Sequence, residues 1–250
     1  MPFVGRSAFA HKGGMHVDGV LKSPETFEHL SPEAVGNART YLLSEQAGRS
    51  ALHARLAPIL PDLSRDAPEL GRLLARMKEM EAEGYAYEAA GASFELLALQ
   101  ELGRWEPFFE VIRFRILGEQ GMTSSAMVKV QVGDEFAITA DEGFGPVNAL
   151  DKALRKAVGQ FYPALGEMRL TDFKVRVISP QDATAAVVRV LIESTDGRRS
   201  WTTVGVSVDI IHASLDALVD SIAYKLWVSD SGASGPRDRG RSEIRRDSDQ

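Results

Sequence analysis

The sequence contains no cysteine, and this absence excludes disulfide bonds, thiolate nucleophiles and cysteine-ligated zinc. It also lacks any apolar run near the roughly 18 residues that a membrane-spanning helix needs. The charged start and apolar stretch of a secretory signal are missing from its N-terminal segment. We therefore expect a cytoplasmic protein without a membrane partner.

An excess of positive charge is missing as well. The 250 residues include 29 Lys and Arg against 35 Asp and Glu, which gives a net charge of −6. Such a chain offers no basic surface for a nucleic acid, so we expect no nucleic-acid partner. The hydrophobic content of 44% is sufficient for an ordinary core. Residues 229–250 are rich in Ser, Gly, Arg and Asp, and we expect them to form a disordered tail.

The first part of the chain, residues 1–107, has a helical pattern. Apolar residues recur at steps of three and four until Gly84, and a further helix is predicted to begin near Ser93. The members of this apolar stripe are Leu70, Leu73, Leu74 and Met77. Such a stripe is typical of a packing surface rather than a cofactor site. We interpret this part as a small helical linker region.

Residues 108–228 change to a β pattern that occurs twice. "EVIRFRIL", "SAMVKVQV" and "EFAITA" precede a helix starting at Pro146, and "FKVRVI", "AAVVRVLIES" and "SWTTVGVSV" precede one starting near Ile210. The hairpin glycines Gly133 and Gly197 are 64 positions apart, as are the two helix starts (197 minus 133 and 210 minus 146). This agreement predicts an α+β fold with a duplicated βββα unit.

The stretch "GRSAFAHKGGMHVDGV" places His11 and His16 five positions apart across two glycines. Histidines that share a metal ion are spaced four apart on a helix or two apart on a strand, and none of the five histidines has either spacing with another. The stretch therefore favours two other interpretations. Either the glycines present His16 and Asp18 for a shared proton-transfer task, or the segment is a surface turn with incidental polar residues.

Several motifs in collinear order resemble one known family. They are "FVGRSAFAHKGGMHVDGVLKSPETFEHLSPEAVGN", "LLSEQAGRS", "EGYAYEAAGASFELL", "EGFGPVNALDKAL" and "WTTVGVSVDIIHASLDALVDSIAYKL". Together they are similar to the C-terminal half of the citramalate synthases, which belong to the 2-isopropylmalate and homocitrate synthase family. The resemblance covers nearly everything from Pro2 to about Leu226.

The resemblance implies a catalytic TIM barrel that is absent from this chain. Full family members begin with that barrel, which binds a divalent metal and acetyl-CoA, and continue with linker subdomains and a duplicated βββα regulatory domain. The barrel carries an Asp-Gly start motif and a His-x-His metal pair; here Asp196-Gly197 lies in a late hairpin and is no substitute. We therefore expect no cofactor in this chain and no turnover by the chain alone.

For the histidine loop, the resemblance implies a catalytic role in trans. His16, with Asp18 beside it, would reach into the active site of a partner subunit and act on the substrate carbonyl or its proton. His11 would be structural. Phe27 stands where relatives often place a Tyr, and a Phe cannot donate a hydrogen bond to a substrate.

For the duplicated domain, the resemblance implies a homodimer that binds an end-product amino acid. Gly143 and Gly145 permit close approach of a ligand, the helix start at Pro146 favours its carboxylate, and Asp209 can pair with its ammonium. The apolar side of the site would be formed by Ile211 and Ala213. The alternative is that the glycines only end hairpins and that Asp209 is a helix cap.

The branched-chain effector expected for a citramalate synthase is isoleucine. A fragment of a 2-isopropylmalate synthase would bind leucine instead, but the text "FAHKGGMHVDG" and "LSEQAGRS" is closer to the citramalate type. A further alternative is a stand-alone amino-acid-binding module without a catalytic role.

Overall fold

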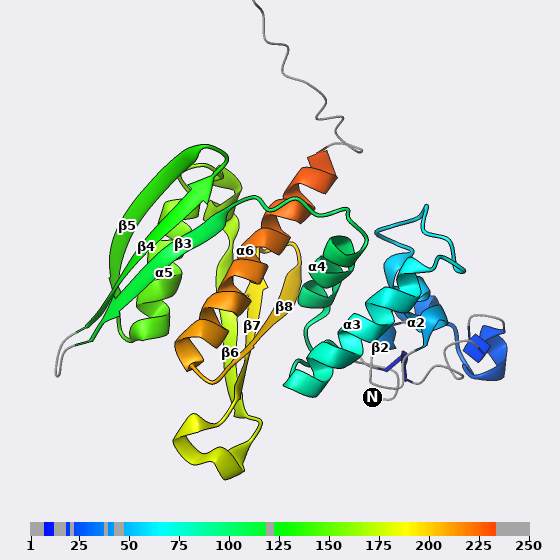
Figure 1. The fold of residues 1–250 in the computed structure, drawn as a ribbon. Helices are drawn as coiled ribbons and strands as arrows, with labels where there is room; N and C mark the ends of the chain where they lie inside the picture. The colour runs from blue at the N-terminus through cyan, green and yellow to red at the C-terminus, as the bar shows by residue number, and fades with distance from the viewer. Residues whose placement is uncertain are drawn as a thin grey trace, which may run out of the picture.

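The computed structural model describes residues 8–12, 19–20, 23–37, 40–42, 48–118 and 123–233. Figure 1 shows a helical part at the N-terminal side of the chain, followed by two sheets that each carry one long helix. This arrangement confirms the predicted α+β class, with the helices of the linker region preceding a duplicated unit.

A short parallel ribbon lies at the start of the linker region. Strand β1 (Ala10–Lys12) pairs with β2 (Thr40–Leu42), and the sequence pattern did not indicate this pairing. Two short 3-10 helices lie between these strands, at Pro24–Thr26 and Pro32–Val35. Each begins with a proline, because the fixed φ of that residue suits the first helical position.

Three α-helices build the core of the linker region. They are α2 (Arg49–Leu56), α3 (Glu69–Glu83) and α4 (Gly91–Glu101). The predicted stripe on α3 is confirmed as packing surface: Leu70, Leu73 and Met77 are fully buried, and Leu74 packs against the same cluster. Gly84 ends α3 with a left-handed φ of 116°. Helix α4 is buried along most of its length, and its buried residues include the polar Ser93 and Glu95.

Each repeat unit contains three antiparallel strands and one helix. The first unit has β3 (Glu110–Leu117), β4 (Ser124–Val132), β5 (Glu135–Gly143) and α5 (Pro146–Val158). The second has β6 (Arg169–Val177), β7 (Val188–Thr195), β8 (Ser200–Ser207) and α6 (Ile210–Ala233). The strand order within each sheet is sequential, so each unit is a meander followed by its helix.

The duplication predicted from the 64-residue spacing is confirmed by equivalent contacts. Thr139 on β5 donates a hydrogen bond to the carbonyl of Ala153 on α5 at 2.6 Å, and Thr203 on β8 does so to Ala217 on α6 at 2.7 Å. Both residues of the second pair lie 64 positions after those of the first. The hairpin glycines of the two units also both have positive φ, 57° and 83°.

The two units share one core. Figure 1 shows α5 against the first sheet and α6 against the second, and the buried residues of both units form one apolar cluster that includes Val128, Leu154, Ile192 and Leu218. Both helices begin at the same end of the domain. The outer side of the second sheet is covered by the linker region, where Val204 of β8 belongs to the linker core. Linker and repeats therefore pack on each other along α4, β8 and α6.

Helix α6 continues through Ala233 and thus includes the first five residues of the tail predicted for residues 229–250. Residues 234–250 lie outside the described part of the chain. Among the described residues, no helix combines the length and the apolar character that crossing a membrane requires.

Candidate functional site

The histidine loop is only partly described. His16 and Asp18 lie outside the described residues, so their catalytic role stays a prediction. His11 is buried, and its Nε2 lies 2.7 Å from Oε1 of Glu28. This contact ties β1 to the segment after the first 3-10 helix and agrees with a structural role for His11. Phe27 is 42% exposed beside this contact.

At the first helix start, Gly143 and Gly145 have different structural roles. A Cβ on Gly143 would lie 2.4 Å from the backbone nitrogen of Ala149, so this glycine allows β5 to pack closely against α5. Gly145 has an extended backbone and open space around its Cα. Among the described residues, no side chain caps α5, which begins at the exposed Pro146. Pro146 has no N–H and that of Ala149 binds the carbonyl of Gly145, so Val147 and Asn148 offer the N–H groups that an anion such as a carboxylate could accept.

At the second helix start, Asp209 is the helix cap. Its Oδ1 accepts a hydrogen bond from the N–H of Ile211 at 2.7 Å, and its Oδ2 lies 2.9 Å from Nδ1 of His212. These contacts, led by the Ile211 N–H, lower the pKa of Asp209. The exposed carboxylate is thus ionised at neutral pH and can attract an ammonium group. Ile211 is half-buried, whereas Ala213 is fully buried against β8 and presents no surface to a ligand in this chain.

The sequence reasoning missed the apolar residues beside these helix starts. Phe144 is 97% exposed and Val208 is 65% exposed, and they occupy equivalent positions 64 residues apart. The ring of His212 also contacts Phe114 of β3, with 5.2 Å between ring centroids. The 64-residue register could have identified the Phe144 and Val208 pair, because it aligns "GFG" with "SVD".

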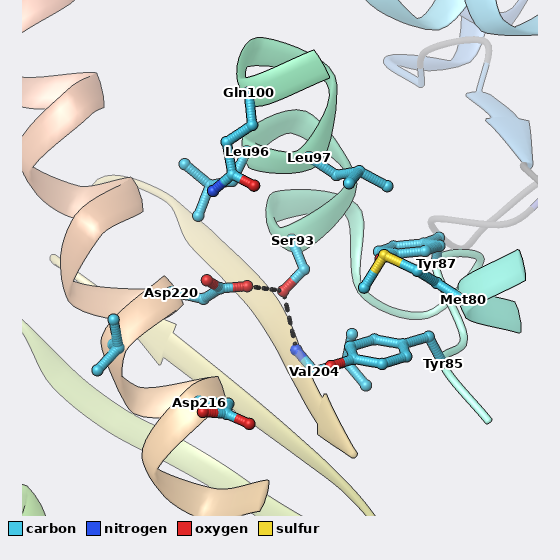
Figure 2. A pocket seen from close by; sticks show the side chains of 11 residues that line it. Met80, Tyr85, Tyr87, Ser93, Leu96, Leu97, Gln100, Val204, Asp216 and Asp220 are labelled. Atoms are coloured by element: carbon cyan, nitrogen blue, oxygen red, sulfur yellow. Dashed lines mark hydrogen bonds between the residues drawn. The ribbon is translucent and has the colours of Figure 1, made fainter. Parts of the chain in front are cut away.

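A second candidate site lies where the linker region meets the repeats (Figure 2). This junction pocket has a volume of about 230 Å³. Its lining residues come from α3, the α3–α4 loop, α4, β8 and α6; they are Met80, Tyr85, Tyr87, Ser93, Leu96, Leu97, Gln100, Val204, Asp216, Val219 and Asp220. The sequence assigned none of these residues to a site.

Ser93 connects the three elements around the junction pocket. Its hydroxyl donates to Oδ2 of Asp220 on α6 at 2.6 Å and accepts the backbone N–H of Val204 on β8 at 3.0 Å (Figure 2). The N–H of an edge strand is thereby satisfied by a helix side chain. One serine thus links α4 to both β8 and α6.

Burial shifts both acids of the junction pocket. Burial raises the pKa of Asp220 to about 7; the hydrogen bond from Ser93 opposes this shift and the nearby charge of Asp216 adds to it. Partial burial likewise raises the pKa of Asp216, although its side chain reaches the surface, against the smaller opposing effect of His212. In the folded chain, both positions therefore disfavour the ionised carboxylate.

This raised pKa predicts a pH-dependent stability. Because folding raises the pKa of Asp220 above its unfolded value of about 3.9, the free energy of unfolding falls as the pH rises from about 4 to about 7. At pH 8, Asp220→Asn should therefore be more stable than the wild type by about 2 kcal/mol. This is roughly half the free energy that corresponds to the full pKa shift, because the side chain is only partly buried. At pH 4, the two proteins should be equally stable.

Urea denaturation of both proteins at the two pH values measures this difference. Asp134→Asn, an exposed change in the first hairpin, serves as the control and should leave the pH dependence unaltered. A difference between Asp220→Asn and wild type that stays constant with pH would contradict the prediction.

Among the described residues, no group of three His, Cys, Asp or Glu side chains is placed to hold a metal ion. The divalent metal and acetyl-CoA stay predictions for a barrel outside this chain.

Comparisons with known proteins match both parts of the chain. The family described as "LeuA allosteric (dimerisation) domain" matches residues 88–226, and "Homocitrate synthase post-HMGL domain-like" matches residues 3–85. The (R)-citramalate synthases of Aquifex aeolicus and Geobacter sulfurreducens are 49% and 48% identical over 90% and 91% of this chain. That of Synechocystis is 46% identical over 90%. The chain spans about 44% of the length of the first two relatives and 43% of the third.

Proposed function

Because the chain belongs to the citramalate synthase family and contains its linker and allosteric domains, we propose that it is the regulatory and dimerisation part of an (R)-citramalate synthase. In this proposal, the complete enzyme condenses acetyl-CoA with pyruvate. This part binds a branched-chain amino acid, with isoleucine favoured, and assembles as a homodimer.

The main support for the proposed amino-acid site is the pair of helix starts at α5 and α6. The start of α5, which no described side chain caps, offers N–H groups to a carboxylate, while the start of α6 presents the ionised Asp209 to an ammonium. Both starts lie at the same end of the domain (Figure 1). An α-amino acid carries both complementary charges, and Ile211 supplies apolar surface for a branched side chain.

Uncovered apolar side chains support the homodimer. Phe144, Val208 and Ile210 are exposed at the helix starts, by 97%, 65% and 41%. Phe173 and Val175 of β6 are exposed by 40% and 41% on the side of the sheet that faces α6. A monomeric domain rarely leaves such a set in water, so we propose that a second copy covers it around the effector site.

Calorimetric titration with isoleucine, leucine and valine tests the proposal. We expect selective binding of isoleucine, and we expect Asp209→Asn to weaken it about 10- to 100-fold, because a hydrogen bond to a charged group contributes about 1.5–3 kcal/mol. Asn caps a helix as well as Asp does, so this variant keeps the helix start intact.

Asp134→Asn removes one charge from the hairpin turn, at the opposite end of β5 from the start of α5, and should bind isoleucine like the wild type. A preference for leucine would move the assignment to the 2-isopropylmalate synthase type. A folded chain that binds none of the three amino acids would overturn the regulatory part of the proposal. A monomeric mass at micromolar concentration would overturn the dimeric part.

A further inference from the structure

The junction pocket brings two acidic side chains together. Asp216 and Asp220 lie one turn apart on α6, and both line the pocket (Figure 2). No Lys, Arg or His is among the side chains that line it. An anion or a zwitterion with an exposed carboxylate would therefore be repelled, whereas a cation would be attracted.

The two carboxylates have free hydrogen-bonding capacity. Within the described part of the chain, Asp216 makes no hydrogen bond or ion pair. Ser93 binds only Oδ2 of Asp220, which leaves Oδ1 for a ligand. Because Ser93 is itself held by the N–H of Val204, the Asp220 carboxylate is fixed in position before any ligand arrives.

The basic side chains that act electrostatically on the lining residues already have partners. Arg76 of α3 acts electrostatically on Tyr85, but its guanidinium forms an ion pair with Glu79 at 3.3 Å. His212 acts on Asp216, and its Nδ1 is bound to Asp209. Neither side chain lines the pocket. A cation that enters the pocket would therefore meet two acids and no basic side chain among the described lining residues, and it would favour the ionised forms that burial alone disfavours.

The opposite wall is aromatic and apolar. Tyr85 and Tyr87 stack with ring centroids 5.9 Å apart and an interplanar angle of 17°. Figure 2 shows the Tyr85 hydroxyl pointing toward the side of the pocket where the two acids lie. Met80, Leu96 and Leu97 complete this wall. Aromatic faces and carboxylates together are the groups that recognise organic cations, whereas a bare metal ion would require more oxygen ligands.

We propose that the junction pocket binds an aliphatic ammonium or guanidinium group, with Asp216 and Asp220 as its counter-charges and Tyr85 and Tyr87 as its aromatic wall. The group belongs either to a free amine or to a Lys or Arg side chain. Since the acids come from α6 and the tyrosines from the α3–α4 loop, the bound cation holds the linker region against the repeats. This site is independent of the proposed effector site at the helix starts.

Titration of the whole chain with n-butylammonium, followed by calorimetry and by NMR of the tyrosine ring protons, tests the proposal. We expect a dissociation constant on the order of 1 mM for such a small probe. 1-Butanol, which matches it in shape but has no charge, should not bind measurably. Isoleucine should not displace the probe, because its carboxylate is excluded from this pocket.

Two variants separate recognition from folding. Asp216→Asn and Asp220→Asn should each weaken n-butylammonium binding at least tenfold, while Asp134→Asn leaves it unchanged. Asp216 is exposed and unbonded within the described chain, so its replacement leaves the packing intact. Unfolding curves recorded on the same samples verify this.

A lysine blocked at both its amino and carboxyl groups distinguishes the two sources of the cation. If it binds as n-butylammonium does, the pocket accepts a protein side chain; if only n-butylammonium binds, the ligand is a free amine. If neither binds, or if binding survives both Asn substitutions, the proposal is overturned. Failure here leaves the isoleucine result untouched, because the two sites share no residue.

Discussion

Gly205→Ala is expected to destabilise the protein by about 3 kcal/mol or more, because β8 and α6 meet there through their backbones. A Cβ on Gly205 would lie 2.0 Å from the carbonyl oxygen of Ala213 and 3.0 Å from the nitrogen of Ala217. Neither atom belongs to a flexible side chain. The strand and the helix would therefore have to separate, and the core between them would loosen.

Urea denaturation of Gly205→Ala beside Gly166→Ala measures this effect. A Cβ on Gly166 meets nothing within 4 Å, so this control should change the free energy of unfolding by less than about 1 kcal/mol. If both variants had the same urea midpoint of unfolding, the backbones of β8 and α6 would not be in close contact at Gly205. In the first unit, the position equivalent to Gly205 is Asp141, and the strand approaches its helix closely at Gly143 instead.

Lys225→Met is expected to lower the free energy of unfolding by about 3 kcal/mol at pH 7. The Nζ of Lys225 lies 2.9 Å from Oδ2 of Asp196, and each side chain is only 5% exposed. Methionine would fill the space of the lysine but leave a buried carboxylate without its cation. The backbone N–H groups of Arg198 and Arg199 still bind Oδ1 of Asp196, which keeps the loss at the lower end of the range for broken buried pairs.

The pH dependence of this loss has a definite sign. Burial alone would raise the pKa of Asp196, but the N–H of Arg199, the Lys225 side chain and the N–H of Arg198 outweigh it and hold the pKa well below its usual range. The pair therefore stabilises the fold above pH 4, and this contribution is lost as the pH falls further. The difference between wild type and Lys225→Met should narrow in acid.

Chemical denaturation with two further variants completes this test. Lys174→Met breaks an ion pair with Asp172 whose side chains are 70% and 39% exposed, so it should cost less than about 1 kcal/mol. The double variant Lys225→Met/Asp196→Asn removes both buried charges and should recover part of the loss. If Lys225→Met were as mild as Lys174→Met, the buried pair would not contribute to stability.

Most helices and strands were predictable because their signals are local. Gly84, Pro146 and the two hairpin glycines act through their own backbone conformations, and the alternation of the strands follows from a sheet with one face on a core. The ribbon of β1 and β2 was not predictable, because three residues on each side are too few to show a period. The continuation of α6 past residue 228 was missed because the polar composition there is typical of a disordered tail. In the structure, the helix propagates into these residues from the buried turns before them.

The candidate sites were predictable to different degrees. Family motifs indicated the helix starts, and the structure adds that Gly143 serves packing, that Asp209 caps its helix and that Ala213 is buried. The junction pocket was invisible in the sequence. Ser93 and Asp220 are 127 positions apart, and their hydrogen bond depends on how α4 docks on α6.

The sequence by itself therefore determined most of the secondary structure, the duplication and the family, because turn chemistry, periodicity and register are properties of neighbouring residues and of the 64-residue spacing. Only the tertiary structure decided which charges lie together. It buried Lys225 against Asp196, and it placed Asp216 and Asp220 in a pocket with two tyrosines and with no basic side chain among the described lining residues. Such pairings depend on contacts between distant segments, and the energy of a charge is set by its surroundings after folding rather than by its place along the chain.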